Sequence, residues 1–166
     1  MAGLVDALQA AGRRAFGPTA SAALLEGSKA FAKRFMVEEG IPTAPASIFD
    51  DYQAALAYLR RQRAPVVVKA DGLAAGKGVF VCASLTEAEQ ALQLIMVERA
   101  FGAAGDLVLI EECLSGEEAS FLAFSDGHTV VPMPVARDYK RIGDNDTGPN
   151  TGGMGGYAPS SFVSPE

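Results

Sequence analysis

Two lysines and three glycines lie close together in residues 66–81, whose sequence is Val-Val-Val-Lys-Ala-Asp-Gly-Leu-Ala-Ala-Gly-Lys-Gly-Val-Phe-Val. Lys69 ends a run of β-branched residues, and Lys77 lies in the loop before the next such run. The glycines of this loop are Gly72, Gly76 and Gly78. Glycines let a backbone approach a ligand closely and direct its N–H groups at one point, and lysines add positive charge there. The segment predicts a hairpin whose tip binds a polyphosphate, with an ordinary glycine-rich turn as the alternative.

Two common nucleotide-binding patterns do not fit this loop. A P-loop needs four residues between its first glycine and its Gly-Lys pair, followed by Ser or Thr. Here three residues separate Gly72 from Gly76, and Gly78 follows the lysine. The dinucleotide pattern needs a third glycine where Val81 stands. A phosphate loop at this position must therefore be of another kind.

Composition limits the classes of partner. The chain has 166 residues, 49% of them hydrophobic and 20% charged, which is typical of one globular domain or two small ones. A net charge of −6 argues against nucleic acid as the main partner. No apolar run approaches a membrane span, and the first residues do not resemble a signal peptide. We therefore expect a cytoplasmic protein in which any anion site is local.

The cysteines and the histidine offer little chemistry. Cys82 and Cys113 are the only cysteines and lie in apolar surroundings, so we expect reduced core thiols instead of a disulfide or zinc site. His128 is the only histidine and follows Asp126-Gly127, which is typical of a solvated turn. Catalytic triads and metal centres that need two histidines are therefore excluded.

Hydrophobic spacing places this loop in an α+β fold built on antiparallel hairpins. Helices are expected at 4–11, 20–26, 28–39 and 52–59, and from Thr86 to beyond Ile95. Strands are expected at 43–49, 66–69, 79–81, 107–111, 119–124 and 129–131. Caps are predicted at Ser28, with Gly40 and Pro42 ending that helix, and at Thr86, with Glu89 completing a capping box. The expected apolar face of helix 86–95 consists of Ala88, Ala91, Leu92 and Ile95.

The helix that begins after Ser28 carries two lysines at helical spacing. Its expected buried stripe is Phe31, Ala32, Phe35 and Met36. Lys29 and Lys33 lie four residues apart, and such a pair is usually on a solvated face.

Residues 143–156 differ in character, because six of these fourteen residues are glycine. The preceding residues 137–141 are densely charged. The segment predicts either a functional glycine-rich loop or a disordered tail.

Residues 110–120 combine a strand edge with carboxylates. Glu111 lies on the expected strand, and a Ser-Gly turn leads to Glu117 and Glu118. A strand edge presents alternating C=O and N–H groups that match an adenine ring, and a carboxylate can accept hydrogen bonds from ribose hydroxyls. Surface charge is the usual explanation of such glutamates, but the position after a phosphate-type hairpin favours nucleotide binding.

Together these segments resemble the ATP-grasp superfamily, and within it the phosphoribosylamine–glycine ligase family. The resemblance covers essentially the whole chain, and its last segment is particular to this family. The segments that carry it are 16–19, 25–33, 67–79, 110–120 and 148–155.

The resemblance implies an enzyme that uses ATP and magnesium to join glycine to 5-phosphoribosylamine through glycyl phosphate in purine synthesis. It implies that Lys29 and Lys69 contact the ATP phosphates, and that the loop with Gly72, Gly76, Lys77 and Gly78 closes over them. It assigns the adenine to the Glu111 carbonyl and the Leu114 N–H, and the ribose to the Glu118 carboxylate. The residues expected on the substrate side are Asp138, Lys140, Asn150, Thr151, Gly152 and Gly153, with Lys69 and Lys140 as catalytic residues.

The same resemblance implies a division of the chain. Residues 1–42 form a helical lead-in, 43–105 a first ATP-grasp subdomain with the glycine-rich flap, and 106–166 the first part of a second subdomain. Family members carry an N-terminal domain and a Leu-Glu-Phe-Asn magnesium motif that this sequence lacks, so we expect no metal ligands in this chain and no turnover by it. The alternatives are a nucleotide-binding fragment without catalysis and an interaction module that has lost its ligand. The retention of Lys69 and of the loop glycines argues against the second.

Overall fold

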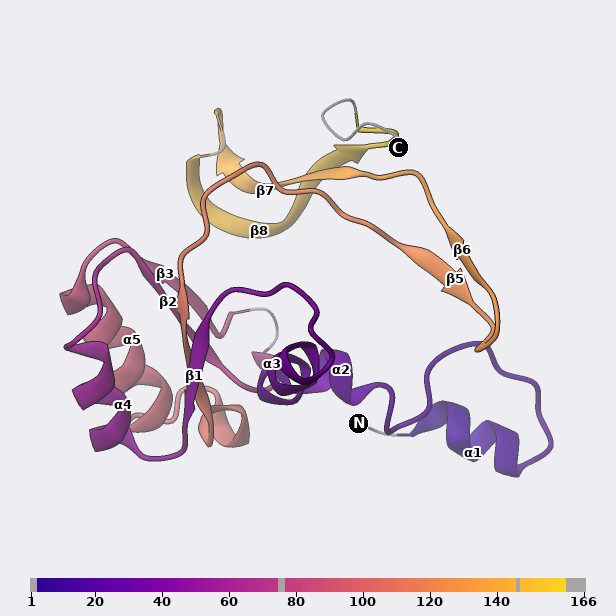
Figure 1. Cartoon of the computed structure of the whole chain (residues 1–166), viewed down its shortest axis with the longest axis horizontal. Coiled ribbons are helices and arrows are strands. Elements are labelled where there is room, and N and C mark those ends of the chain that lie inside the picture. Colours follow the sequence, from indigo (N-terminus) through magenta and orange to yellow (C-terminus); the bar gives the residue numbers. More distant parts are fainter. Residues whose placement is uncertain (1–2, 75–76, 146, 161–166) are drawn as a thin grey trace. The chain divides into compact units, whose positions relative to one another are not determined.

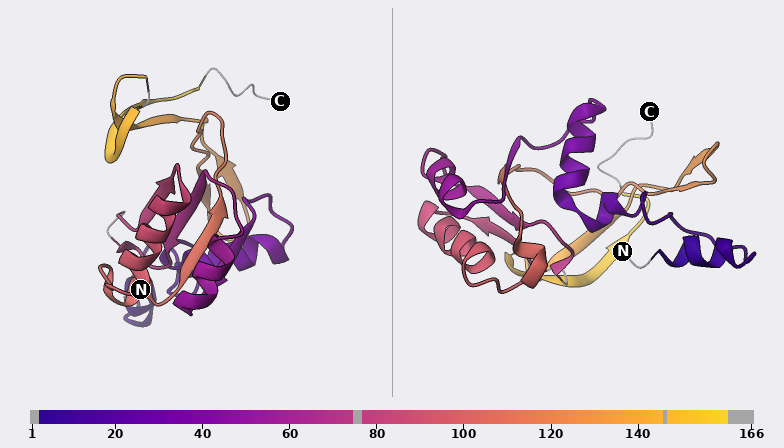
Figure 2. Two further views of the ribbon diagram at one scale, coloured as in Figure 1. Left: turned by 90° about the vertical axis from the view of Figure 1, so that its left-hand side faces the viewer. Right: turned by 90° about the horizontal axis from the view of Figure 1, so that it is seen from below.

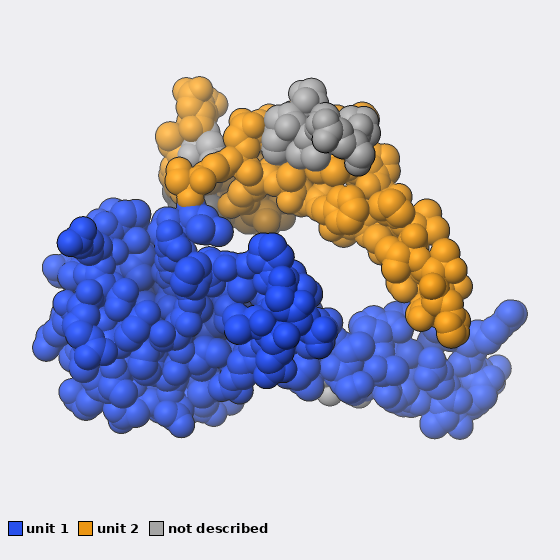
Figure 3. Space-filling view, viewed as in Figure 1, with its two compact units in different colours: residues 1–114 blue, residues 115–166 orange. Residues whose placement is uncertain are grey.

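The computed structural model describes residues 3–74, 77–145 and 147–160. Its contacts divide the chain into two compact units, residues 1–114 and 115–166 (Figure 3). Each unit has its own sheets, and we describe each by itself.

The first unit is built on a four-stranded antiparallel sheet (Figure 1). Its strands are β1 (Ala46–Phe49), β2 (Val66–Ala70), β3 (Val79–Cys82) and β4 (Val108–Glu112), in the order β1-β4-β2-β3. β2 and β3 pair with Val67 opposite Val81 and Lys69 opposite Val79, which confirms the predicted hairpin. β4 lies between β1 and β2, with Leu109 opposite Lys69 and Glu111 opposite Val67.

Two helices, α4 (Tyr52–Leu59) and α5 (Leu85–Met96), cover one face of this sheet (Figure 2). Because side chains alternate along a strand, Val66, Val68 and Ala70 of β2 all point to that face. They form the core with the predicted inner face of α5, and this prediction is confirmed. Besides Val66, Val68 and Ala70, the core consists of Ala55, Leu59, Cys82, Ala88, Ala91, Leu92, Ile95, Val108 and Ile110.

The start of α5 differs from the prediction. The cap is Ser84, whose Oγ accepts a hydrogen bond from the Glu87 N–H at 3.2 Å, while the Glu87 carboxylate accepts from the Ala83 N–H at 3.0 Å. Thr86 and Glu89 fit the same sequence pattern, but both lie within the helix, which begins at Leu85. The Glu89 carboxylate instead pairs with Arg60, at the end of α4, at 2.8 Å. With Ser84 as its cap, α5 begins earlier than predicted.

Three further helices precede the sheet: α1 (Leu4–Ala10), α2 (Leu24–Gly27) and α3 (Lys29–Glu38). The Ser28 cap of α3 is confirmed, since its Oγ accepts from the Phe31 N–H at 3.0 Å, and Gly40 follows the helix with a left-handed φ of 67°. The predicted stripe of α3 is wrong in part, because Phe31 and Phe35 are 38% and 37% exposed. The buried residues of α3 are Ala30 and Lys33.

A short 3₁₀ helix, η2 (Gly102–Gly105), leads into β4. Because β4 is a central strand of the sheet, the first unit continues to Leu114, beyond the boundary expected after residue 105.

The second unit contains two strand pairs. β5 (Ala123–Ser125) pairs with β6 (Val130–Pro132), and β7 (Arg137–Gly143) pairs with β8 (Thr147–Tyr157). Asp126 shapes the first turn, because its Oδ1 accepts from the His128 and Thr129 N–H groups at 2.9 and 2.7 Å. These hydrogen bonds lower the pKa of the Asp126 carboxyl.

The glycine-rich tail is a strand and not the predicted loop or disordered segment. Its backbone pairs with β7, from Arg137 opposite Tyr157 to Gly143 opposite Thr147. The Tyr139 and Tyr157 rings stack at 6.3 Å between centroids, and the Arg137 guanidinium lies 5.0 Å from the Tyr139 centroid. The tyrosine pair packs across the two strands and the arginine packs along β7, and together they supply the side-chain packing that glycine cannot.

Both cysteines are free thiols, as predicted, but only Cys82 belongs to the core, since Cys113 is partly exposed. In the part of the chain that the structure describes, no helix is long and apolar enough to cross a membrane.

Candidate functional site

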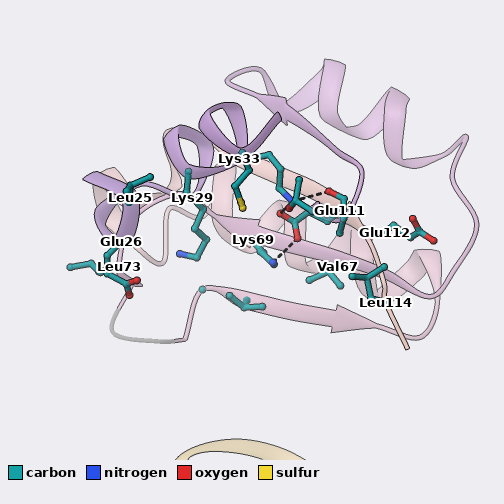
Figure 4. Close-up of a pocket in the computed structure, with 16 residues that line it drawn as sticks. Leu25, Glu26, Lys29, Lys33, Val67, Lys69, Leu73, Glu111, Glu112 and Leu114 are labelled. Atoms are coloured by element: carbon teal, nitrogen blue, oxygen red, sulfur yellow. Dashed lines mark hydrogen bonds and ion pairs between the residues drawn. The ribbon is translucent and has the colours of Figure 1, made fainter. Parts of the chain in front are cut away.

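A cavity of about 650 Å³ lies in the first unit, on the sheet face opposite α4 and α5 (Figure 4). Its walls come from α2, α3, the linker that follows α3, β2, the loop after β2, and the end of β4. Its lining residues include Lys29, Lys33, Lys69, Gly78, Glu111 and Leu114.

Lys69 reaches this cavity because of strand alternation. Val67 and Lys69 share one face of β2, opposite the core residues Val66, Val68 and Ala70. The Lys69 ammonium lies 2.5 Å from Oε2 of Glu111, whose side chain is only 7% exposed. Lys69 therefore has a fixed position at the cavity wall.

Lys33 is the second partner of Glu111, and it corrects the expectation of a solvated lysine. Its Nζ lies 3.3 Å from Glu111 Oε1 and donates to Thr43 Oγ1 at 2.6 Å and to the Ala44 carbonyl at 2.8 Å. Its side chain is 8% exposed. The signal in the sequence was its spacing of four residues from Lys29, which places both lysines on one face of α3.

Lys29 lies at the first turn of α3 and contacts the base of the glycine-rich loop. Its Nζ donates to the Gly72 carbonyl at 2.6 Å and to the Asp71 carbonyl at 3.3 Å. Burial lowers the pKa of the Lys29 ammonium, the Asp71 carboxylate opposes this, and the charge of Lys69 lowers it further. A second cation nearby thus makes this position favourable for an anion.

Asp71, which sequence reasoning did not single out, joins the end of β2 to the start of α3. Its Oδ1 accepts from the Ala30 N–H at 2.6 Å and from Ser28 Oγ at 3.0 Å, and its carbonyl accepts from the Lys29 N–H at 3.1 Å. The available signal was an aspartate, a preferred capping residue, directly after a strand. Asp71 therefore fixes the start of α3, with Lys29, relative to the loop after β2.

Two of the loop glycines are required by close packing. A Cβ on Gly72 would lie 2.7 Å from the Ala104 Cβ, and one on Gly78 would lie 2.7 Å from the Ala74 Cβ. Gly76 falls outside the described residues. Lys77 is exposed and is not among the residues that line the cavity, so the structure brings Lys69 but not the Lys77 side chain to it.

The end of β4 forms the far wall of the cavity. Glu111 and Leu114 both line it, and Leu114 is 68% exposed. The predicted phosphate-type loop and the predicted strand edge are therefore parts of one cavity in the first unit.

The remaining predicted residues gather in the second unit. Glu118, Asp138 and Lys140 line a cavity of about 220 Å³, and Lys140 Nζ lies 3.9 Å from Asp138 Oδ2. Thr151 Oγ1 donates to the Lys140 carbonyl at 2.8 Å and accepts from the Gly153 N–H at 3.1 Å. Gly152 and the backbone of Asn150 belong to the same strand, β8.

Within residues 3–74, 77–145 and 147–160, no group of three or more His, Cys, Asp or Glu side chains could hold a metal ion. The described residues therefore do not form a metal centre of their own.

One cavity brings together a β-hairpin with a glycine-rich tip, a lysine before that tip, a lysine at a helix start and the end of a sheet strand. This combination defines an ATP-grasp domain. The family model of the phosphoribosylglycinamide synthetase ATP-grasp (A) domain matches residues 27–166, and the chain belongs to this family.

Named relatives agree with this assignment. The chain is 58% identical over 164 residues to the phosphoribosylamine–glycine ligases of Vibrio vulnificus and Xanthomonas campestris, covering 99% of this chain. It spans 38% of the length of these curated relatives.

Solved structures show the same relationship. The crystal structure of phosphoribosylamine–glycine ligase from Thermotoga maritima matches with a TM-score of 0.81 and 43% identity, over 89% of this chain and 38% of that one. A D-alanyl-alanine synthetase A from Vibrio cholerae matches with a TM-score of 0.67 at 17% identity, over 81% of this chain and 40% of that one. The second match shows the shared fold alone.

Proposed function

We propose that the chain is the nucleotide-binding part of an ATP-dependent ligase that joins glycine to 5-phosphoribosylamine through glycyl phosphate. The observation that carries the proposal is the convergence of Lys29, Lys69 and the end of β4 on one cavity. The names of relatives 58% identical to this chain support the choice of substrates. Because the chain spans 38% of those relatives, ligation is proposed for a protein that also carries the rest of their length. A cytoplasmic location belongs to the same proposal.

The cavity has the size and the charge that a nucleotide needs. Its volume of about 650 Å³ is within the range of ordinary ligand sites. The ammonium groups of Lys29 and Lys69 mark the phosphate end, next to the loop that begins at Gly72. The end of β4 and the residues after it, from Glu111 to Leu114, mark the adenine end, where backbone groups would bind the amino group and the ring.

The residues of this chain contribute positioning and charge neutralisation. Phosphoryl transfer to a carboxylate depends mainly on holding the phosphates in place and on balancing their negative charge. Lys69, held by Glu111, and Lys29, held by the carbonyls of Asp71 and Gly72, supply two such charges. Magnesium that accompanies ATP would add to this neutralisation, and we assign no step through it.

The residues of the second unit belong to the same proposal by resemblance. Glu118 is proposed to accept hydrogen bonds from ribose hydroxyls, and Asp138, Lys140 and residues 150–153 to bind on the substrate side. Lys140 is proposed as a catalytic residue; its ammonium lies 3.9 Å from Asp138 Oδ2, and its backbone carbonyl accepts a hydrogen bond from Thr151.

Competition binding tests the nucleotide assignment. A fluorescent ATP analogue is titrated with the purified chain and then displaced with ATP, GTP or inorganic triphosphate. We expect ATP to displace it at lower concentration than GTP, because the Glu111 carbonyl and the Leu114 N–H are proposed to bind the adenine amino group and ring. Equal displacement by triphosphate would show a phosphate site without nucleotide recognition, and no binding would contradict the proposal.

A further inference from the structure

Lys33 has a place in the site that neither the loop nor the strand edge explains. It is a lysine with an 8% exposed side chain, and it shares the Glu111 carboxylate with Lys69 (Figure 4). Lys33 contacts Oε1 and Lys69 contacts Oε2. Two cations and one anion therefore form a single buried cluster with a net charge of +1.

The contacts of Lys33 hold it firmly in the cavity wall. Besides Glu111 it donates to Thr43 Oγ1 and to the Ala44 carbonyl, both in the linker between α3 and β1. A buried lysine is costly unless such partners surround its ammonium group. Lys69, by contrast, has a side chain that is 26% exposed and lies on the open side of the cluster. The geometry makes Lys33 the inner cation and Lys69 the outer one.

We infer that Lys33 is a positioning residue that neutralises Glu111, so that the charge of Lys69 remains available to an anionic ligand. Without Lys33, the Glu111 carboxylate would have Lys69, 2.5 Å away, as its main counter-charge. The net charge of the cluster would fall from +1 to zero. A polyphosphate bound by Lys69 would then be attracted less strongly, without any direct contact to Lys33 being lost. This inference rests on the proposed function, in which Lys69 binds the ATP phosphates.

A double-mutant cycle tests whether Lys33 acts through Lys69. ATP affinity is measured by calorimetry for the wild-type chain, Lys33→Met, Lys69→Met and the double variant. We expect Lys33→Met to weaken ATP binding about tenfold, and to cause no more than about a twofold further loss once Lys69 is absent. Equal losses in both backgrounds would overturn the inference, because a loosened fold would weaken binding whether or not Lys69 is present.

A second variant separates charge from packing. Glu111→Gln removes the anion, so the combination Lys33→Met with Glu111→Gln restores a net charge of +1 to the cluster. We expect this combination to recover most of the ATP affinity that Lys33→Met loses. Ile95→Val is the matched control, because it disturbs the core on the opposite face of the sheet and should lower the melting temperature without changing ATP affinity. No recovery in the combined variant would contradict the inference.

Inorganic triphosphate tests the inference without the nucleoside, because it senses only the charge of the cluster. Calorimetry should show weaker triphosphate binding in Lys33→Met, and recovery when Glu111→Gln is added. Unchanged or tighter triphosphate binding in Lys33→Met would overturn the inference.

The two measurements also separate the inference from the proposed function. If the wild-type chain binds ATP no more tightly than triphosphate but triphosphate affinity changes as expected, the nucleotide proposal fails and the charge relation between Lys33 and Lys69 stands. If Lys33→Met does not fold, Lys33→Gln keeps hydrogen-bond donors without the charge and replaces it. If neither folds, Glu111→Gln alone must tighten triphosphate binding, and weaker binding would overturn the inference.

Discussion

At the scale of single residues, the two lysines of the glycine-rich segment are not equivalent. Lys69 ends a strand of the sheet and is held by Glu111, whereas Lys77 is exposed on the loop. An ordered charge loses less conformational freedom when it binds a ligand, so it contributes more to affinity.

We therefore predict that Lys69→Ala weakens ATP binding more than Lys77→Ala does. Loss of one charge-assisted contact costs about 1.5–3 kcal/mol, or roughly ten- to a hundredfold in the dissociation constant. Calorimetric titration of both variants measures the difference, with circular dichroism as the control for folding. Equal losses would show that the loop lysine is as well placed as the strand lysine.

The two thiols should differ in reactivity, and the difference depends on pH. Burial, with a smaller effect of the Glu87 carboxylate, raises the pKa of the Cys82 thiol from 9.0 to about 11. The reactive thiolate of Cys82 is therefore scarce at pH 8, while Cys113 is partly exposed. We expect iodoacetamide at pH 8 to modify Cys113 in the folded chain and to modify Cys82 only after urea is added.

The same pKa shift has a consequence for stability. A pKa that is higher in the folded than in the unfolded chain contributes stability below the unfolded value, and this contribution is lost as pH rises through the folded value. The melting temperature should therefore fall between pH 9 and 11 more steeply in the wild type than in Cys82→Ala. Rapid labelling of Cys82 in the folded chain would contradict both expectations.

At the scale of elements, the joint between β2 and α3 positions the site. Asp71 accepts hydrogen bonds from the first turn of α3, and the loop that Lys29 contacts begins at the same residue. The strand and the helix are thus tied together where the two lysines approach each other.

We predict that Asp71→Ala lowers both stability and ATP affinity. Loss of a capping carboxylate costs about 0.5–2 kcal/mol of the free energy of unfolding, which urea denaturation measures. Asp51→Ala is the matched control, because Asp51 caps α4 in the same way, accepting from the Ala54 N–H at 2.7 Å, but lies away from the cavity. Asp51→Ala should cost similar stability and leave ATP affinity unchanged. If both variants weakened ATP binding equally, Asp71 would have no special role.

Elements with a strong apolar pattern could be predicted from the sequence. The β2–β3 hairpin and the inner face of α5 follow from β-branched runs and from spacing of three and four residues. The cap of α5 could not be predicted uniquely, because Ser84 with Glu87 and Thr86 with Glu89 fit one pattern, and packing chooses between them. The pairing of β8 was missed because glycine has little strand propensity and only its partner β7 orders it.

The site was predictable where a residue's role depends on its own element. Lys69, Gly78 and the end of β4 reach the cavity because of strand alternation and loop position. Helical spacing alone favours a solvated face for Lys33. Its burial depends instead on Glu111, which is distant in the sequence, and on the fold of the linker. Whether a lysine is buried depends on its tertiary partners, and these cannot be identified from local sequence spacing.

At the scale of the whole molecule, the chain corresponds to one part of the longer proteins of its family. It spans 38% of the length of relatives that are 58% identical to it. Among the described residues, no carboxylate cluster could hold a metal ion. Transfer of a phosphoryl group from ATP generally requires metal ions that bridge the phosphates, and two lysines do not replace that charge.

We therefore predict that the 166-residue polypeptide binds ATP but does not release ADP in a glycine-dependent reaction. The assay supplies ATP, magnesium, glycine and freshly generated phosphoribosylamine, and couples ADP release to a fluorescent readout. The full-length ligase of Vibrio vulnificus is the positive control, and a chimera that adds its remaining residues to this chain should recover activity. Glycine-dependent ADP release by the 166-residue chain above a protein-free control would mean that its own carboxylates hold the metal. Glu117, which pairs with Arg137 at 3.0 Å, would be the first to replace.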